Sequence, residues 1–380
     1  TAPRPFAYIG ADVPRELIEA AGFRPVRLSG AGAAARTDLP ANFSARARSL
    51  TDQLLRGDFA GCAIGHGSVE DVQLFASLRE LDRNGLSCSF PVVFVDLLHQ
   101  AGSPVFAYNL ARLRQFKTAL EGLSGKTVTD SALAAAIASA DRLRASARTV
   151  FERRTAHTPT LSGADALNLL RDLGGLTVTE ADSRLAEFSD GAPLTGKRLL
   201  VTGSPHETDA IYRLAEAAGA VIVGEDHDWG DLWLDGDPDP TLPPLEALAA
   251  RPQQRPSADP TASSAARAQA LARRAVALRV DGLLHFRLDG DEAAPWDLKS
   301  TADALGETGV PLLALTTAST AEGDKAAEVT ARVAAFLAGK PVTDPARPAS
   351  RTAAPPPAKP KGDDAGRRSR KALSCTRDFS

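Results

Sequence analysis

The sequence predicts an α/β protein built on largely parallel sheets. Short apolar runs alternate with longer segments of helical period, which is the pattern of βαβ units. The alternation stops near residue 109 and restarts near residue 197, which indicates two such sheets joined by a helical region. With 380 residues, the chain is long enough for two or three domains of roughly 100–200 residues each.

The first predicted α/β domain covers residues 1–108. Its first strand is expected at 6–9, and a short helix follows at 14–22, with Pro in its first turn and Gly at its end. The apolar run at 91–95 is continuous, as expected of a strand covered on both faces. The other elements expected here are strands at 23–28 and 59–64, a helix ending near 57 and a helix at 69–81.

A helical region is expected at 109–193 and a second α/β domain at 194–340. In the helical region, leucines recur at three- and four-residue intervals, and Thr129 precedes a long Ala-rich segment as its N-cap. A looser stretch ends at Pro193, and a Pro-rich surface segment is expected at 235–260. Residues 109 to about 155 are expected to be almost purely helical. The elements expected elsewhere are strands at 197–203, 220–223, 282–286 and 310–315, and helices at 162–173, 209–218, 265–278, 297–305 and ending near 336.

The composition changes after residue 340. Residues 341–371 are rich in Pro, Ala and basic side chains, which predicts a disordered tether because so few apolar groups cannot form a core. Residues 372–380 are interpreted as the possible start of a following domain, with a frayed basic tail as the alternative.

Charge and hydropathy exclude several classes of protein. The 44 basic residues face 47 acidic ones, for a formal net charge of −3, which argues against a nucleic-acid binder. No apolar run reaches the roughly 18–20 residues that span a bilayer, and no secretory signal opens the sequence, so we expect no membrane partner and a cytoplasmic location. Three cysteines, Cys62, Cys88 and Cys375, are too few for a disulfide scaffold.

The turns after the predicted strands hold the candidate site residues, because ligands bind at the carboxyl ends of parallel strands. The first such turn holds Gly65, His66, Gly67 and Ser68, where glycines allow close backbone approach and the following helix start favours an anion. His66 is a candidate acid, base or ligand. Ser68 is a candidate binding residue, or only the N-cap of the helix.

Two further turns follow strands of the second domain. Gly203 and Ser204 belong to a strand–turn–helix unit without a nucleotide-binding fingerprint, so a structural turn is the alternative reading. Asp226 lies in an acidic loop with His227, where a divalent metal site competes with the commoner outcome of solvated acids. Cys62, inside a strand, and Cys88, in a Ser-rich loop, are only weak candidates as metal ligands.

Several of these segments, in this order, resemble the 2-hydroxyacyl-CoA dehydratase and benzoyl-CoA reductase subunits, including the 2-hydroxyglutaryl-CoA dehydratase D-component. The opening resembles the pattern P-x-E-L-hydrophobic-x-A-A-G-x-x-P-V-R, which Pro14 begins and Arg27 ends. The other similar segments, which extend the resemblance to about residues 5–338, are 110–137, 196–205, 218–226, 280–285 and 309–313.

This resemblance implies a subunit of two Rossmann-like (flavodoxin-like) domains that forms a heterodimer with a related subunit. It also implies acyl-CoA bound near a 4Fe-4S cluster held by three cysteines, an ATP-dependent activator that supplies an electron, and a ketyl radical.

The chain departs from that pattern at the cluster. The family's first cysteine aligns best with Ser68 or Val69, and its last falls near Arg287 or Leu288. We therefore hypothesise a pseudoenzyme subunit that lacks the cluster, is inactive alone, supports acyl-CoA binding and pairs with a cluster-bearing subunit, which would be fused C-terminally if a domain follows. The alternatives are an active 4Fe-4S subunit with ligands such as Cys62, His66 and Cys88, or an acyl-CoA or anionic-ligand binding protein without a redox role.

Overall fold

The computed structural model describes residues 2–31, 44–83, 85, 90–255, 262–288, 291, 294–317 and 324–340. The described residues all belong to one compact unit. The expected tether at 341–371 and the segment 372–380 lie outside the described residues, as do Cys88 and Cys375. The expected boundaries at 108 and 193 stay predictions.

The first sheet has four parallel strands in the order β2-β1-β3-β4. In register, Ala7 of β1 lies opposite Val26 of β2 on one side and Cys62 of β3 on the other. Parallel strands need a crossover connection, and helices supply it here. The strands of this sheet are β1 (Pro5–Ile9), β2 (Arg24–Arg27), β3 (Cys62–Gly65) and β4 (Val92–Val95).

The second sheet repeats this arrangement, with four parallel strands in the order β6-β5-β7-β8. The second strand in sequence again lies outside the first, and the third and fourth follow on the other side. The predicted α/β fold with two flavodoxin-like parallel sheets is therefore confirmed. Its strands are β5 (Lys197–Gly203), β6 (Ala220–Glu225), β7 (Gly282–Leu288) and β8 (Leu312–Thr317).

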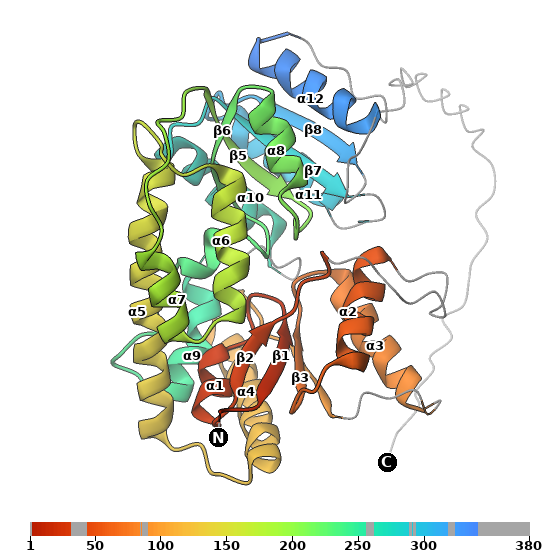
Figure 1. Cartoon of the computed structure of the whole chain (residues 1–380), viewed down its shortest axis with the longest axis vertical. Coiled ribbons are helices and arrows are strands. Elements are labelled where there is room, and N and C mark those ends of the chain that lie inside the picture. The colour runs from red at the N-terminus through yellow and green to blue at the C-terminus, as the bar shows by residue number, and fades with distance from the viewer. Residues whose placement is uncertain are drawn as a thin grey trace, which may run out of the picture. The chain divides into compact units, whose positions relative to one another are not determined.

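Helices surround both sheets (Figure 1). Those of the first part of the chain are α1 (Arg15–Ala20), α2 (Ala45–Arg56), α3 (Val69–Arg83), α4 (Ser103–Ser124), α5 (Asp130–Thr155), α6 (Gly163–Gly175) and α7 (Val178–Ala186). Those of the second part are α8 (Ala210–Ala217), the 3-10 helix η1 (Asp231–Leu234), α9 (Pro244–Gln254), α10 (Ser264–Ala277), α11 (Ala294–Gly306) and α12 (Asp324–Leu337).

Helix α5 runs alongside both sheets (Figure 1). Its 26 residues begin after Thr129, whose side chain accepts a hydrogen bond from the amide of Ala132, as the sequence predicts. The helix contacts α1 beside the first sheet and β6 of the second. Two of its arginines, Arg144 and Arg154, are almost completely buried. This single helix therefore connects the cores of the two halves.

The prediction of a surface segment at 235–260 is wrong in part, because it contains α9. Pro244 lies in the first turn of this helix, where a missing N–H does no harm. The residues from Ala247 to Ala250 are buried, and α9 packs against α4. The stretch expected to be loose also contains a helix, α7, which begins with a capping box between Thr177 and Glu180.

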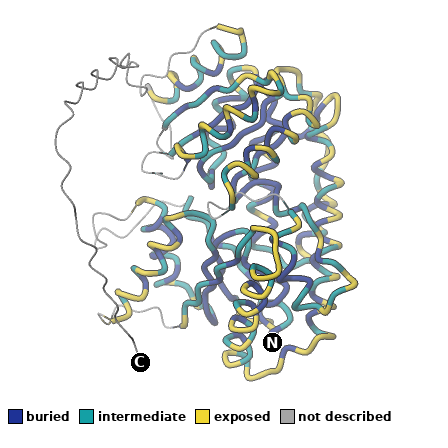
Figure 2. Tube along the Cα trace, turned by 180° about the vertical axis from the view of Figure 1, so that it is seen from behind, coloured by how far each residue is buried: buried dark blue, intermediate teal, exposed yellow. Residues whose placement is uncertain are grey.

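The buried residues follow the strands and the inner faces of the helices (Figure 2). One cluster around Phe6 and Leu17 packs on one face of the first sheet, and another around Ile64 and Leu50 contains Cys62. Because both faces are covered, the buried residues of the strands are mostly apolar, as expected of parallel sheets. Among the described residues, no helix is long and apolar enough to cross a membrane.

Candidate functional site

The carboxyl ends of the two sheets are in direct contact. We call the loops that follow β1, β2 and β3, together with the start of α2, the first edge. We call the loops that follow β5 and β6 the second edge. Acidic side chains of the second edge reach backbone amides and arginines of the first, and two contacts, one through Asp228 and one through Glu207, join the edges. Ligands bind at the carboxyl ends of parallel strands, so this junction is the candidate site.

Asp228 makes the first contact. Its Oδ1 accepts a hydrogen bond from the amide of Ala11 at 2.8 Å, and its Oδ2 lies 2.7 Å from Nη2 of Arg27. The guanidinium of Arg27 also lies 3.8 Å from the ring centre of Trp229, where it makes a cation–π contact. Both partners of the ion pair are buried, so a carboxylate here is held by an amide and a guanidinium in a water-poor site.

Glu207 makes the second contact. Its Oε1 accepts from Nε of Arg46 at 2.6 Å, and its Oε2 accepts from the hydroxyl of Ser29 at 3.2 Å and from the amide of Gly30. Burial raises the pKa of Glu207, but Arg46 and these hydrogen bonds outweigh burial and hold the pKa below its ordinary value. Arg46 also binds Asp71 at 2.7 Å, so its charge is shared among several carboxylates.

The predicted residues after β3 lie at the first edge. A Cβ on Gly67 would lie 2.9 Å from the carboxyl carbon of Asp228, so only glycine leaves room for that side chain. Ser68 accepts a hydrogen bond from the amide of Asp71 at 3.3 Å, as a capping residue of α3 does. His66 packs near the ring of Phe94, and its Nδ1 lies 4.0 Å from a carboxylate oxygen of Asp96.

Gly203 and Ser204 fix the end of β5 against β7. Gly203 has a φ of +110°, and a Cβ there would lie 2.1 Å from the carbonyl oxygen of Phe286. The Oγ of Ser204 accepts from the amide of Leu288 at 2.9 Å and donates to Asp291 at 2.5 Å. These contacts account for both residues structurally, and their role in binding stays a prediction.

Asp226 lies on another side of the second edge from Asp228. It lines a cavity of about 260 Å³ beside α10, together with Arg267 and Arg274. Burial raises the pKa of Asp226 despite these two arginines. The structure therefore brings Gly67 and Asp228 together at the junction and leaves Asp226 in a neighbouring cavity.

Behind the second edge lie two buried histidines. The rings of His206 and His227 are 5.3 Å apart, and Nε2 of His227 lies 2.7 Å from the hydroxyl of Tyr212. Glu225 also accepts from this hydroxyl, and it is paired with Arg154. Burial lowers the pKa of His227 to about 4 and that of His206 well below its ordinary value, so both are neutral at pH 7.

The sequence prediction named none of the four side chains that join the edges as binding residues, although two of them, Glu207 and Asp228, lie in the candidate turns after strands of the second domain; the other two are Arg27 and Arg46. Arg27 is the last residue of β2 and therefore lies at the carboxyl end of a parallel strand, where ligands bind. Its position in the sequence could have marked it as a candidate site residue. The start of α2 near Arg46 follows residues 32–43, which are not described, and the sequence pattern alone does not bring it close to Glu207.

A 4Fe-4S cluster needs several thiolates at one site, and the described residues contain one cysteine, Cys62, since Cys88 and Cys375 lie outside them. Within the described ranges, no three metal-ligating side chains come together. Cys62 is completely buried in the apolar cluster around Ile64, where it presents no sulfur to the junction. Ser68, which aligns best with the first cysteine of the resembling family, instead caps α3. No step can therefore be derived through such a cluster on these residues.

Comparison with known proteins gives one clear result. A family model described as "2-hydroxyglutaryl-CoA dehydratase, D-component" matches residues 11–338. The match runs from the loop after β1 to the end of α12 and so includes strands β2 to β8. No curated protein matches the chain.

Proposed function

The chain belongs to the 2-hydroxyglutaryl-CoA dehydratase D-component family, and we propose that it is a subunit of a 2-hydroxyacyl-CoA dehydratase or benzoyl-CoA reductase type of complex that contributes acyl-CoA binding rather than a cluster. The family match over residues 11–338 carries this proposal. In this role the chain is inactive alone and pairs with a related, cluster-bearing subunit, to which an ATP-dependent activator delivers the electron.

The chemistry of the first edge supports binding of an anionic ligand. The amides of Ala11 and Gly30 and the guanidiniums of Arg27 and Arg46 all donate to carboxylates there. Guanidiniums and backbone amides at strand ends are also the groups that bind phosphates, and CoA carries three of them. Asp228 and Glu207 occupy these donors, so a phosphate must replace a carboxylate when the ligand binds.

The thiol positions support a subunit without its own cluster. Cys62 lies in the apolar core, and Ser68 and Arg287 stand at or near positions where the family has cysteines. In this proposal the chain's residues bind and orient the acyl-CoA, and the partner subunit supplies the redox chemistry. The predicted site residues His66, Gly67, Ser68, Gly203, Ser204 and Asp226 remain candidates for contact with the ligand.

Two measurements on the full chain test the proposal. Anaerobic reconstitution with iron and sulfide, followed by metal analysis and EPR, is expected to give no stoichiometric 4Fe-4S signal. A stoichiometric signal would instead establish the active alternative with ligands such as Cys62, His66 and Cys88. Calorimetric titration with CoA is expected to show binding that Arg27→Gln weakens about 10- to 100-fold through loss of a charge-assisted contact.

The matched control is Arg142→Gln, because Arg142 lies on the exposed face of α5. Circular dichroism of each variant separates loss of binding from loss of fold. An anion-binding protein without a redox role is the second candidate, since the donors of the first edge would serve it equally well. Affinity purification of the native chain separates the two, because only the subunit proposal requires a cluster-bearing relative to copurify.

A further inference from the structure

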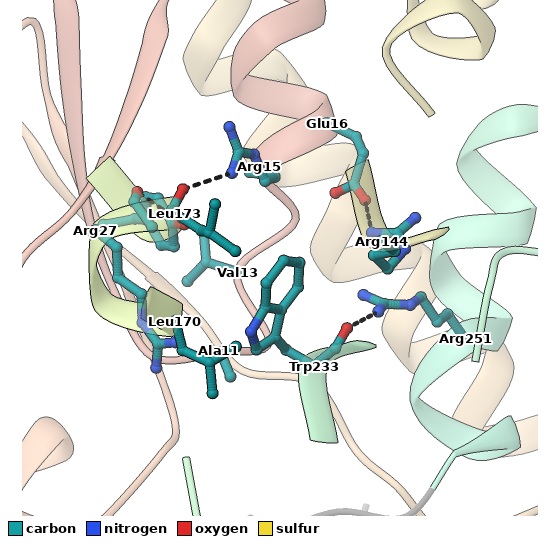
Figure 3. Close-up of a pocket in the computed structure, with 12 residues that line it drawn as sticks. Ala11, Val13, Arg15, Glu16, Arg27, Arg144, Leu170, Leu173, Trp233 and Arg251 are labelled. Carbon is teal, nitrogen blue, oxygen red and sulfur yellow. Dashed lines mark hydrogen bonds and ion pairs between the residues drawn. The ribbon is translucent and has the colours of Figure 1, made fainter. Parts of the chain in front are cut away.

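A small cavity rich in arginine lies beside the junction (Figure 3). Its volume is about 40 Å³, several times the roughly 10–15 Å³ that one water molecule needs. Pockets for cofactors and drug-sized ligands measure roughly 300–1,000 Å³, so this one is too small for CoA. Its charged lining residues are Arg15, Glu16, Arg27, Arg144 and Arg251.

Three of the four arginines have a carboxylate partner. Arg144 donates to Glu16 at 2.7 Å, and Glu16 is itself the one acidic residue in the wall of the cavity. The other two pairs are Arg15 with Glu19 at 3.0 Å and Arg27 with Asp228 at 2.7 Å.

Arg251 differs from the other three. Its described hydrogen bonds all go to backbone carbonyls, those of Trp233, Asp235 and Gly236. Within the described ranges, no carboxylate is hydrogen-bonded to it. In Figure 3 its guanidinium points toward Trp233 and lies next to that of Arg144. A partly buried cation beside another cation is unfavourable unless an anion compensates it.

The electrostatics of Arg251 agree with this geometry. Burial, together with the charges of Arg255 and Arg144, lowers the pKa of Arg251 to about 9, although the carboxylates of Glu16 and Asp12 act in the opposite direction. Asp12 does not neutralise it by direct contact, because that carboxylate is taken by Arg255 and His99.

Two more hydrogen-bond donors in the cavity wall make only long hydrogen bonds. The hydroxyl of Tyr8 has its described contact with the carbonyl of Gly174 at 3.5 Å, and Nη1 of Arg15 lies 3.4 Å from the carbonyl of Leu173. Both distances are at the long end for hydrogen bonds. Both side chains are buried, so a stronger acceptor inside the cavity would improve their hydrogen bonding.

We propose that this cavity binds one small inorganic oxyanion of the phosphate or sulfate class, with Arg251 as its principal ligand. Nε and Nη2 of Arg251 donate to the three carbonyls, so its Nη1 is the nitrogen that would donate to the oxyanion, and Tyr8 and Arg15 supply further donors. The site is separate from the proposed acyl-CoA function, because the cavity does not admit CoA and its central arginine takes no part in the junction.

Calorimetric titration of the full-length protein with inorganic phosphate tests the proposal. One phosphate per chain is expected to bind, and sulfate is expected to compete. Sodium chloride at matched ionic strength is the control for screening, and acetate is the probe for a carboxylate ligand. Binding of acetate as tight as that of phosphate, or no saturable binding of phosphate, would overturn the assignment.

Arg251→Gln locates the site. It removes the charge but keeps a polar side chain of similar reach, and it is expected to weaken phosphate binding about 10- to 100-fold. Arg142→Gln is the matched control and is expected to bind as the wild type does. Arg251→Lys keeps the charge without the planar fork and is expected to bind at an intermediate level.

A second readout separates binding from a structural role. Without phosphate, Arg251→Gln is expected to unfold at the same or a higher urea concentration than the wild type, because it removes an uncompensated cation. Added phosphate is expected to raise the urea midpoint of the wild type but not that of Arg251→Gln. A variant that keeps the phosphate effect would refute the proposed role of Arg251. If the variant does not fold, the stoichiometry of the wild type still decides whether the site exists.

Discussion

The two sheets have the same strand order, but the groups at their carboxyl ends that meet at the junction differ in charge. The first edge presents amides and arginines, among them Arg27 and Arg46, whereas the second presents the carboxylates of Glu207 and Asp228 and a buried histidine pair behind them. The buried middle residues of the strands are mostly apolar in both sheets. Charge at each edge is therefore set by strand ends and loops, which the sheet topology does not constrain.

The difference makes the edges complementary. Asp228 and Glu207 of the second edge each accept hydrogen bonds from a backbone amide and a guanidinium of the first, so these two carboxylates are paired across the junction. The arginines of the first edge keep their charge over the whole pH range of folding, whereas burial shifts the pKa of groups near the second edge, that of His227 down to about 4 and that of Asp231 up to about 6.

The largest loss of stability is expected when one of the two buried arginines of α5 is replaced. Arg154 and Glu225 are completely buried, so Arg154→Met leaves an uncompensated carboxylate and should lower the free energy of unfolding by about 3–5 kcal/mol. Arg144→Met should have a smaller effect, because two of its partners, Asp141 and Asp237, remain hydrated. Urea unfolding of both variants measures the difference, and equal losses would contradict it.

The next largest effect is a loss of stability at acid pH, which should come mainly from His227 behind the second edge. Folded His227 has a pKa of about 4, whereas an unfolded histidine has one near 6.5. Between these values the unfolded state binds more protons, so stability is complete above pH 6.5 and falls as the pH drops toward 4. The loss attributable to His227 should be roughly 2–3 kcal/mol.

Urea midpoints at several pH values between 4 and 7.5 measure this loss. Asp231, whose pKa burial raises to about 6, acts in the opposite direction below pH 6, so the comparison must be made with His227→Gln. This variant should show a flatter profile than the wild type. Identical profiles would exclude His227 as the source of the acid sensitivity.

The smallest loss of stability is expected from a substitution that disturbs the close packing of the two edges. Gly67→Ala places a Cβ 2.9 Å from the carboxyl carbon of Asp228 and should lower the free energy of unfolding by about 1–3 kcal/mol. Gly122→Ala is the control, because its Cβ meets no atom within 4 Å and a helix favours Ala over Gly. Chemical denaturation should show opposite signs for the two variants, and equal behaviour would mean that the edges are not tightly apposed.

Much of the fold could be predicted from the sequence, because strands such as 197–203 and helix starts such as Thr129 carry strong local patterns. Helix α9 could not, since its prolines resembled those of a surface loop, and its burial depends on α4, far away in the chain. The candidate site was predicted only as separate turns. The pairing of Arg27 with Asp228 spans 201 residues, and periodicity contains no information about such contacts.

The long helix α5 has a mechanical consequence. Arg144 and Arg154 are ten residues apart, or about 15 Å along the helix axis, and each is tied to a different half of the protein. Sliding either half along α5 would separate a buried ion from its partner, which is unfavourable. We therefore expect these two ion pairs to hold both halves at fixed positions along one helix.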